Sequence, residues 1–168
     1  MSVSLGPTGL IGAGQVLQVV RAMSSTQASR NSGTYGEVSA AYRIGITPKL
    51  STSKLIIEFS FNTSMATHHH TSSFRIIQVG TSAYIGEATP SNSQRPAGHA
   101  SVRGQYNTDN ACQVMMRTVV PSSSTSARTY GFESRNTASI NIGSSQQDRS
   151  DPWGWACPVV MTITEMQT

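Results

Sequence analysis

The chain has 168 residues, enough for one domain with a short extension and too few for a second sizeable core. Only 12% of the residues are charged, whereas Ser and Thr fill 44 positions, a balance unlike that of a typical cytosolic enzyme. The formal net charge is +4, but the basic residues are scattered singly, so no nucleic-acid-binding surface is indicated.

The sequence shows neither a membrane-spanning segment nor a secretion signal. No segment approaches the roughly 18 apolar residues of a membrane span, and no signal peptide is evident at the N-terminus. We therefore expect that the chain does not insert into a membrane and that it folds in a reducing cytosol. Cys112 and Cys157 are then expected to be free thiols in or near the core, with a single disulfide as the alternative.

The first 14 residues are predicted to form an N-terminal arm ahead of one domain over residues 15–168. Glycine recurs at every third place of this arm, at Gly6, Gly9 and Gly12. Three such triplets are too few for a collagen-like triple helix, so a flexible leader is favoured. The arm also carries three apolar side chains that favour burial against a partner and are the candidate attachment residues: Leu5, Leu10 and Ile11.

The first half of the domain shows strand patterns. Residues 15–23 are apolar and β-branched and predict a strand, and the polar residues 24–34 predict a loop. Apolar residues alternate with others over 42–47, which predicts a strand that ends at Pro48 because proline cannot donate to a ladder. The alternation over 55–62 predicts a strand with one face in the core.

The second half repeats the pattern at about ten-residue spacing. Strands are predicted at 73–79, 83–85, 111–120, 129–133, 138–142 and 159–166. Long loops are predicted at 89–98 and 143–158. Eight to ten strands without a helix indicate an all-β fold, an antiparallel two-sheet β-sandwich of jelly-roll type.

Three consecutive histidines, His68, His69 and His70, are the most conspicuous candidates for chemistry. Consecutive residues of an extended chain point to opposite faces, so the three cannot readily bind one metal ion. A solvated loop, with no metal and no cofactor, is therefore predicted. The alternative is that, in a trimer, one histidine from each subunit meets the others on the axis and the three bind a metal ion.

No enzyme is predicted. The chain lacks a Gly-x-Ser-x-Gly elbow, and His99 lies in a Pro/Gly-rich loop. A glycosidase needs two carboxylates across a cleft. The strand carboxylates Glu58, Glu133 and Glu165 are instead expected at outward positions.

Two tryptophans, Trp153 and Trp155, lie close together in a predicted loop. Sugar rings or a protein partner could stack on such indoles. Packing at the end of the sandwich or at a subunit interface is the favoured interpretation.

Three segments, in this order, resemble small tail-fibre-like virion surface proteins, decoration or fibre-knob proteins, of tailed marine and freshwater phages. The segments are Gln15–Val20, Ile44–Ile57 and Met161–Met166, which are similar to a "GxVLQVV" start, an "ITPxxxxSKIL" hairpin and a "TxxEI" finish. The resemblance covers about residues 14–168. The chain departs from the pattern in its His-rich and Trp-containing loops, where partner contacts usually vary.

The resemblance implies a non-enzymatic protein of the virion surface, made in the host bacterial cytoplasm. Its expected form is a homotrimeric β-sandwich knob, held to capsid or tail proteins through the short arm. A head decoration (cement) protein or short fibre is the leading hypothesis. The alternative is a tail-fibre receptor-binding module that recognises a host surface glycan through the loops at 68–70 and 153–155.

Overall fold

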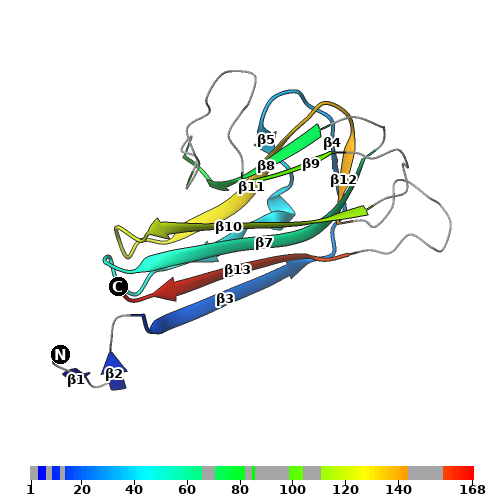
Figure 1. Cartoon of the computed structure of the whole chain (residues 1–168). Coiled ribbons are helices and arrows are strands. Elements are labelled where there is room, and N and C mark those ends of the chain that lie inside the picture. The colour runs from blue at the N-terminus through cyan, green and yellow to red at the C-terminus, as the bar shows by residue number, and fades with distance from the viewer. Residues whose placement is uncertain are drawn as a thin grey trace.

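The computed structural model describes residues 4–6, 9–11, 14–65, 71–81, 85, 99–103, 111–143 and 157–168. Strands dominate these residues, and their only helix is the 3-10 turn η1 (Ala40–Tyr42) (Figure 1). No helix within these ranges is long and apolar enough to cross a membrane. Two antiparallel sheets confirm the predicted all-β sandwich.

The larger sheet has six strands, and β7 runs through its middle. One side of β7 pairs along its length with β10, and the other side pairs first with β13 and then with β12. Outside these, β3 pairs with β13 and β4 pairs with β12. The strands are β3 (Val16–Ser24), β4 (Ala28–Arg30), β7 (Lys54–Met65), β10 (Ala111–Pro121), β12 (Ile140–Ile142) and β13 (Val159–Met166).

The smaller sheet has five strands, with β11 at its centre. On one side β11 pairs with β8, which in turn pairs with β9. On the other side β11 pairs with β6 near its start and with β5 further along. The strands are β5 (Gly36–Glu37), β6 (Ile44–Ile46), β8 (Thr71–Gln78), β9 (Ala100–Arg103) and β11 (Arg128–Asn136).

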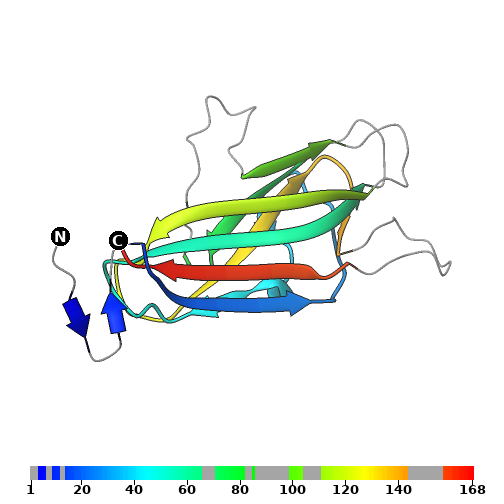
Figure 2. The same cartoon turned by 60° about the horizontal axis from the view of Figure 1, so that its bottom comes forward.

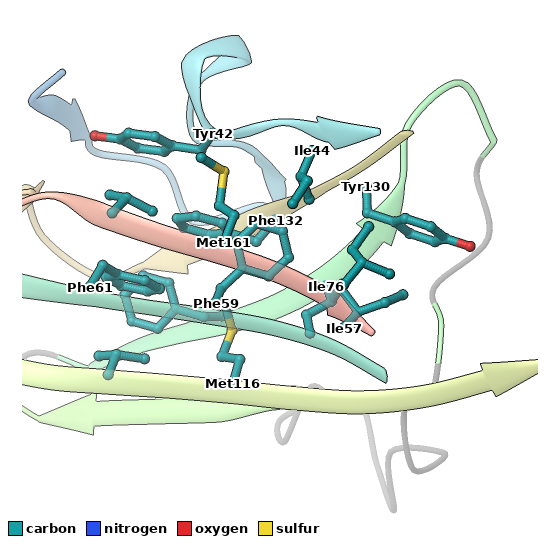
Figure 3. Close-up of a cluster of buried hydrophobic side chains, with 14 of the residues drawn as sticks. Tyr42, Ile44, Ile57, Phe59, Phe61, Ile76, Met116, Tyr130, Phe132 and Met161 are labelled. Carbon is teal, nitrogen blue, oxygen red and sulfur yellow. The ribbon is translucent and has the colours of Figure 1, made fainter. Parts of the chain in front are cut away.

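The core lies between the inner faces of the two sheets (Figure 3). Phe132 from the smaller sheet stacks on Phe61 from the larger one, with ring centroids 4.7 Å apart. Phe59 and Phe74 meet the same ring edge-on, at 5.3 and 6.4 Å. Because aromatic rings bury large apolar areas and prefer such offset and edge contacts, this cluster joins the two sheets.

Tyr42 shows why one predicted strand is shorter than expected. Its ring is buried, as the alternation predicts, but its backbone lies in η1, whose first turn is capped by the Ser39 hydroxyl accepting from Ala41 N–H. The Tyr42 hydroxyl donates to the carbonyl of Thr26 at 2.6 Å. Burial raises the pKa of Tyr42 to about 12, so the hydroxyl keeps its proton. The strand therefore begins only at Ile44.

Most predicted strands are confirmed, with several differences, among them the short strand β5, which was not predicted. The predicted loop 24–34 contains β4, whose polar residues carry no alternation signal. The strand β9 follows a bend at His99 and was not predicted. In the predicted strand 83–85, Ile85 is not in a strand, and the other two positions lie outside the described residues.

The N-terminal segment forms a short hairpin from β1 (Ser4–Gly6) and β2 (Gly9–Ile11). The two strands pair antiparallel with each other, which is a local structure and not the extended chain of a triple helix. In both views the hairpin lies outside the two sheets, at the end of the molecule where the C-terminus is found (Figures 1 and 2).

Candidate interaction surface

The residues predicted to carry function are placed only in part. Leu5 and Leu10 face each other as backbone partners in the hairpin, and Ile11 pairs with Ser4. The loop with His68, His69 and His70 and the loop with Trp153 and Trp155 lie outside the described residues. The attachment, metal and glycan hypotheses for these side chains therefore stay predictions.

The structure instead reveals an apolar surface on the larger sheet. The large apolar side chains that are exposed in the described part of the chain all lie on its two long edge strands, β3 and β10. They are Val16 (50% exposed), Val19 (57%), Met23 (59%), Met115 (67%) and Val119 (51%). Figure 2 looks onto this side of β10, β7, β13 and β3, with no strand of the smaller sheet in front of it.

The strand register arranges these side chains in rows across the sheet. One row contains Val119, Ile56, Thr164 and Val19. A second row, four residues along each strand, contains Met115, Ser60, Val160 and Met23. We call the outward side chains of these two rows the outer apolar face; its two central strands contribute half-buried residues and its edges the exposed ones.

A polar row separates the two apolar rows. It contains Arg117, Glu58, Thr162 and Arg21. Arg117 Nε lies 3.6 Å from Glu58 Oε1, and both side chains are exposed enough that solvent screens this ion pair. The row carries charges of both signs, so a neighbouring molecule can match it with charges of its own.

Both edges of the outer apolar face are long. β3 has nine residues and β10 has eleven, and in the described part of the chain each pairs with a strand on one side only. A long edge with exposed apolar side chains is a ready template for association with another chain. The outer apolar face is therefore the candidate interaction surface of the described part of the chain.

The outer face of the smaller sheet is different, because it carries two ion pairs. Arg75 Nη2 lies 2.7 Å from Glu133 Oε2, and Arg43 Nε lies 2.6 Å from Glu37 Oε1. The hydrogen bond from Arg43 outweighs burial and lowers the pKa of Glu37. Among the described residues, exposed large apolar side chains lie on the larger sheet alone.

A buried carboxylate holds one edge of the outer apolar face in place. Glu165, expected to point outward, is fully buried; that prediction is wrong, because Glu165 continues the inward alternation of Val159, Met161 and Ile163. Its Oε2 accepts from Gln18 Nε2 of β3 at 2.6 Å. The inward position therefore serves a structural hydrogen-bond network.

The same carboxylate organises the turn before β7. Glu165 Oε1 accepts from Ser53 Oγ at 2.6 Å, and the backbone N–H groups of Lys49 and Leu50 also donate to it. Burial alone would raise the pKa of Glu165, but these hydrogen bonds, with that from Gln18, outweigh it and lower the pKa. Lys49 Nζ donates to the carbonyl of Leu17 in β3 at 2.9 Å. The turn is therefore bound to β3 directly through Lys49 and indirectly through Glu165 and Gln18.

The remaining reactive side chains hold structural positions. His99 Nδ1 accepts from the Ile76 N–H at 3.1 Å, and burial lowers the pKa of His99. Cys112 and Cys157 are half-buried free thiols, and Cys157 Sγ accepts from Asn62 Nδ2. Within the described ranges no three His, Cys, Asp or Glu residues are placed to hold a metal ion.

Comparison with known proteins gave distant structural neighbours only. No protein family matches the chain, and no curated protein matches it. Among solved structures, it is similar to the VP2 subviral particle of infectious bursal disease virus, at 11% identity and a TM-score of 0.46. It is also similar to the structure of the Gx strain of that virus, at 10% identity and a TM-score of 0.48. All of this chain is covered, but only 42% and 41% of the two neighbours, so it spans less than half their length.

Proposed function

We propose that this chain is a non-enzymatic structural protein of a phage particle, a small homotrimeric knob of the head-decoration (cement) or short-fibre type. The outer apolar face carries the proposal. Five exposed large apolar side chains lie on the two long edge strands β3 and β10 of one sheet, and four of them belong to the outer apolar face, as expected of a protein that is complete only in an assembly.

The occupant proposed for the outer apolar face is a second copy of the same chain. Exposed Met and Val side chains each gain free energy when another apolar surface removes them from water, about 1.5–3 kcal/mol for a full burial. The polar row between them lets an arginine of one copy meet Glu58 of the next. Self-association through one sheet face also leaves the outer face of the other sheet accessible.

The hairpin at the N-terminus is the proposed attachment element. It lies outside both sheets (Figure 1), so it can contact the particle without disturbing the core. Leu5, Leu10 and Ile11 would supply its apolar contacts. A decoration protein of this kind stabilises an assembled shell because it binds the assembled form alone.

Attachment is tested by mixing the purified chain with particles that lack it and sedimenting the particles. The full chain should sediment with them. A variant without residues 1–14 should stay folded and keep its oligomeric state, because the sandwich core lies within 15–168, but should remain in the supernatant. A truncated variant that still sediments would overturn the role of the arm. Absence of the chain from purified virions would overturn the function itself.

A further inference from the structure

A pocket opens on the smaller sheet, the sheet opposite the outer apolar face. It has a volume of about 390 Å³ and is lined by Gly33, Thr34, Tyr35, Arg75 and Arg135. Arg75 comes from β8 and Arg135 from β11, whereas the other three residues form the segment that leads into β5. Small-ligand sites start at about this volume, roughly 300 Å³.

The wall formed by residues 33–35 is fixed by hydrogen bonds to its backbone. Arg135 Nε donates to the carbonyl of Gly33 at 2.7 Å, and Arg30 Nη2 donates to the carbonyl of Thr34 at 3.0 Å. Just before it, the Asn136 N–H donates to the carbonyl of Ser32 at 2.8 Å. A wall held in this way is formed before a ligand arrives, so binding costs little conformational entropy.

Arg75 is held on two sides. Its Nε and Nη2 lie 2.8 and 2.7 Å from Glu133 Oε2, and its guanidinium carbon lies 3.7 Å from the centroid of the Tyr35 ring. The ion pair with Glu133 compensates its charge, and the ring fixes its plane. Arg75 therefore forms a rigid side of the pocket.

Arg135 supplies the uncompensated charge. Its Nε is used by the Gly33 carbonyl, and it forms no ion pair in the part of the chain that the structure describes. Its two Nη groups, with four N–H donors, have no acceptor among those residues. A planar guanidinium in this position is suited to bind a carboxylate with two parallel hydrogen bonds.

We propose that this pocket binds the carboxylate of an acidic sugar, with Arg135 as the carboxylate-binding residue. The volume exceeds that of a bare carboxylate, and the wall presents both polar and apolar surface, which suits a sugar ring with its hydroxyl groups and its C–H faces. The Thr34 hydroxyl makes one hydrogen bond, of 3.1 Å with Ser32 Oγ, and can make another with a sugar hydroxyl. A Cβ built on Gly33 would meet nothing within 4 Å, so the space beside Gly33 is open to a ligand.

This inference goes beyond the proposed structural role and does not depend on it. The pocket and the outer apolar face belong to different sheets, so sugar binding and self-association can be measured separately. If sugar binding is not observed, the proposed self-association is unaffected, and the reverse also holds.

The direct test is a titration of the isotope-labelled full chain, followed by NMR, with glucuronate, glucose and acetate in turn. Glucuronate should cause saturable shifts of the amide signals of Thr34, Tyr35 and Arg135. Glucose, which lacks the carboxylate, and acetate, which lacks the sugar ring, should each bind about ten-fold more weakly or not at all. Equal binding of acetate would overturn the sugar assignment, and equal binding of glucose would overturn the role of the charge.

Variants of Arg135 test its role as the carboxylate-binding residue. Arg135→Gln should weaken glucuronate binding about ten-fold or more, and Arg135→Lys should restore only part of it, because lysine keeps the charge without the planar fork. Arg117→Gln removes the same charge from the opposite sheet and should leave binding unchanged. Wild-type affinity in Arg135→Gln, or full restoration by lysine, would overturn the assignment. The wild-type titration decides the question if Arg135→Gln does not fold.

Discussion

Ser53 Oγ donates a 2.6 Å hydrogen bond to Glu165 Oε1, which joins the turn before β7 to the C-terminal strand across 112 residues of sequence. Both side chains are buried, and the same carboxylate accepts from two backbone N–H groups and from Gln18. A buried charge is tolerated here because donors surround it. This network fixes β3, one edge of the outer apolar face, in its place.

Replacing Glu165 with Gln should destabilise the fold strongly. The amide carries no charge, and its NH2 group would replace one of the two oxygens that now accept hydrogen bonds. Leaving buried donors without acceptors should lower the free energy of unfolding by about 2–4 kcal/mol, measured by urea denaturation. Glu58→Gln, at an outward position on β7, should change it by less than about 0.5 kcal/mol. Equal effects of the two changes would contradict this role of Glu165.

The same carboxylate should make stability depend on pH. Its pKa in the folded protein is lowered from an ordinary value of 4.5, so its contribution is complete above about pH 4.5 and is lost as pH falls through the folded pKa. Glu37, whose pKa is also lowered, should act in the same direction. The urea concentration at the midpoint of unfolding should therefore decrease as the pH is lowered below about 4.5. In Glu165→Gln this decrease should be less steep. An unchanged slope in that variant would show that other groups carry the effect.

The aromatic cluster should respond to loss of its central ring. Phe132 contacts the rings of Phe61, Phe59 and Tyr42 (Figure 3). It also contacts the ring of Phe74. Phe132→Ala leaves a cavity between the sheets and should cost about 3–5 kcal/mol of unfolding free energy, measured by chemical denaturation. Phe132→Leu keeps most of the apolar volume and should cost clearly less. A loss below about 1 kcal/mol in the alanine variant would contradict the central place of this ring.

Gly143 should not tolerate a side chain. Its φ angle is +79°, and a Cβ would lie 3.0 Å from the carbonyl oxygen of Thr26. Gly143→Ala should therefore cost about 1–3 kcal/mol. Gly33→Ala is the matched control, since its φ is not positive and a Cβ there has open space. Similar melting temperatures for the two variants would argue against strain at Gly143.

Period-two alternation made the sandwich predictable. It is clean in β7 and β13, where one face is buried and the other is half-exposed, and it places the core correctly. Short polar strands such as β4 carry no such signal, because their pairing depends on a distant partner, here β12. Tyr42 obeyed the burial pattern in a turn instead of a strand, because its hydroxyl binds the Thr26 carbonyl.

The functional surface was predictable only in part. The loops predicted to bind a ligand, at 68–70 and 153–155, lie outside the described residues. The outer apolar face was not predicted from the sequence. Its signal was present, since 16–20 and 114–116 are runs in which apolar residues fall on both faces of a strand. Glu165 was misplaced because a carboxylate was assumed to face solvent, although the alternation of β13 placed it inside.

The mass of the chain in solution tests the central claim most directly. In light scattering after size-exclusion chromatography, the wild-type chain should have three times the 17.9 kDa mass of one chain. A Met115→Lys, Val119→Lys variant places two charges on the outer apolar face without touching the core and should fall to the mass of one chain. Thr125→Lys, in the exposed turn between β10 and β11, should keep the trimer mass. A wild-type monomer, or a double-lysine variant that keeps the wild-type mass, would contradict assembly through this face.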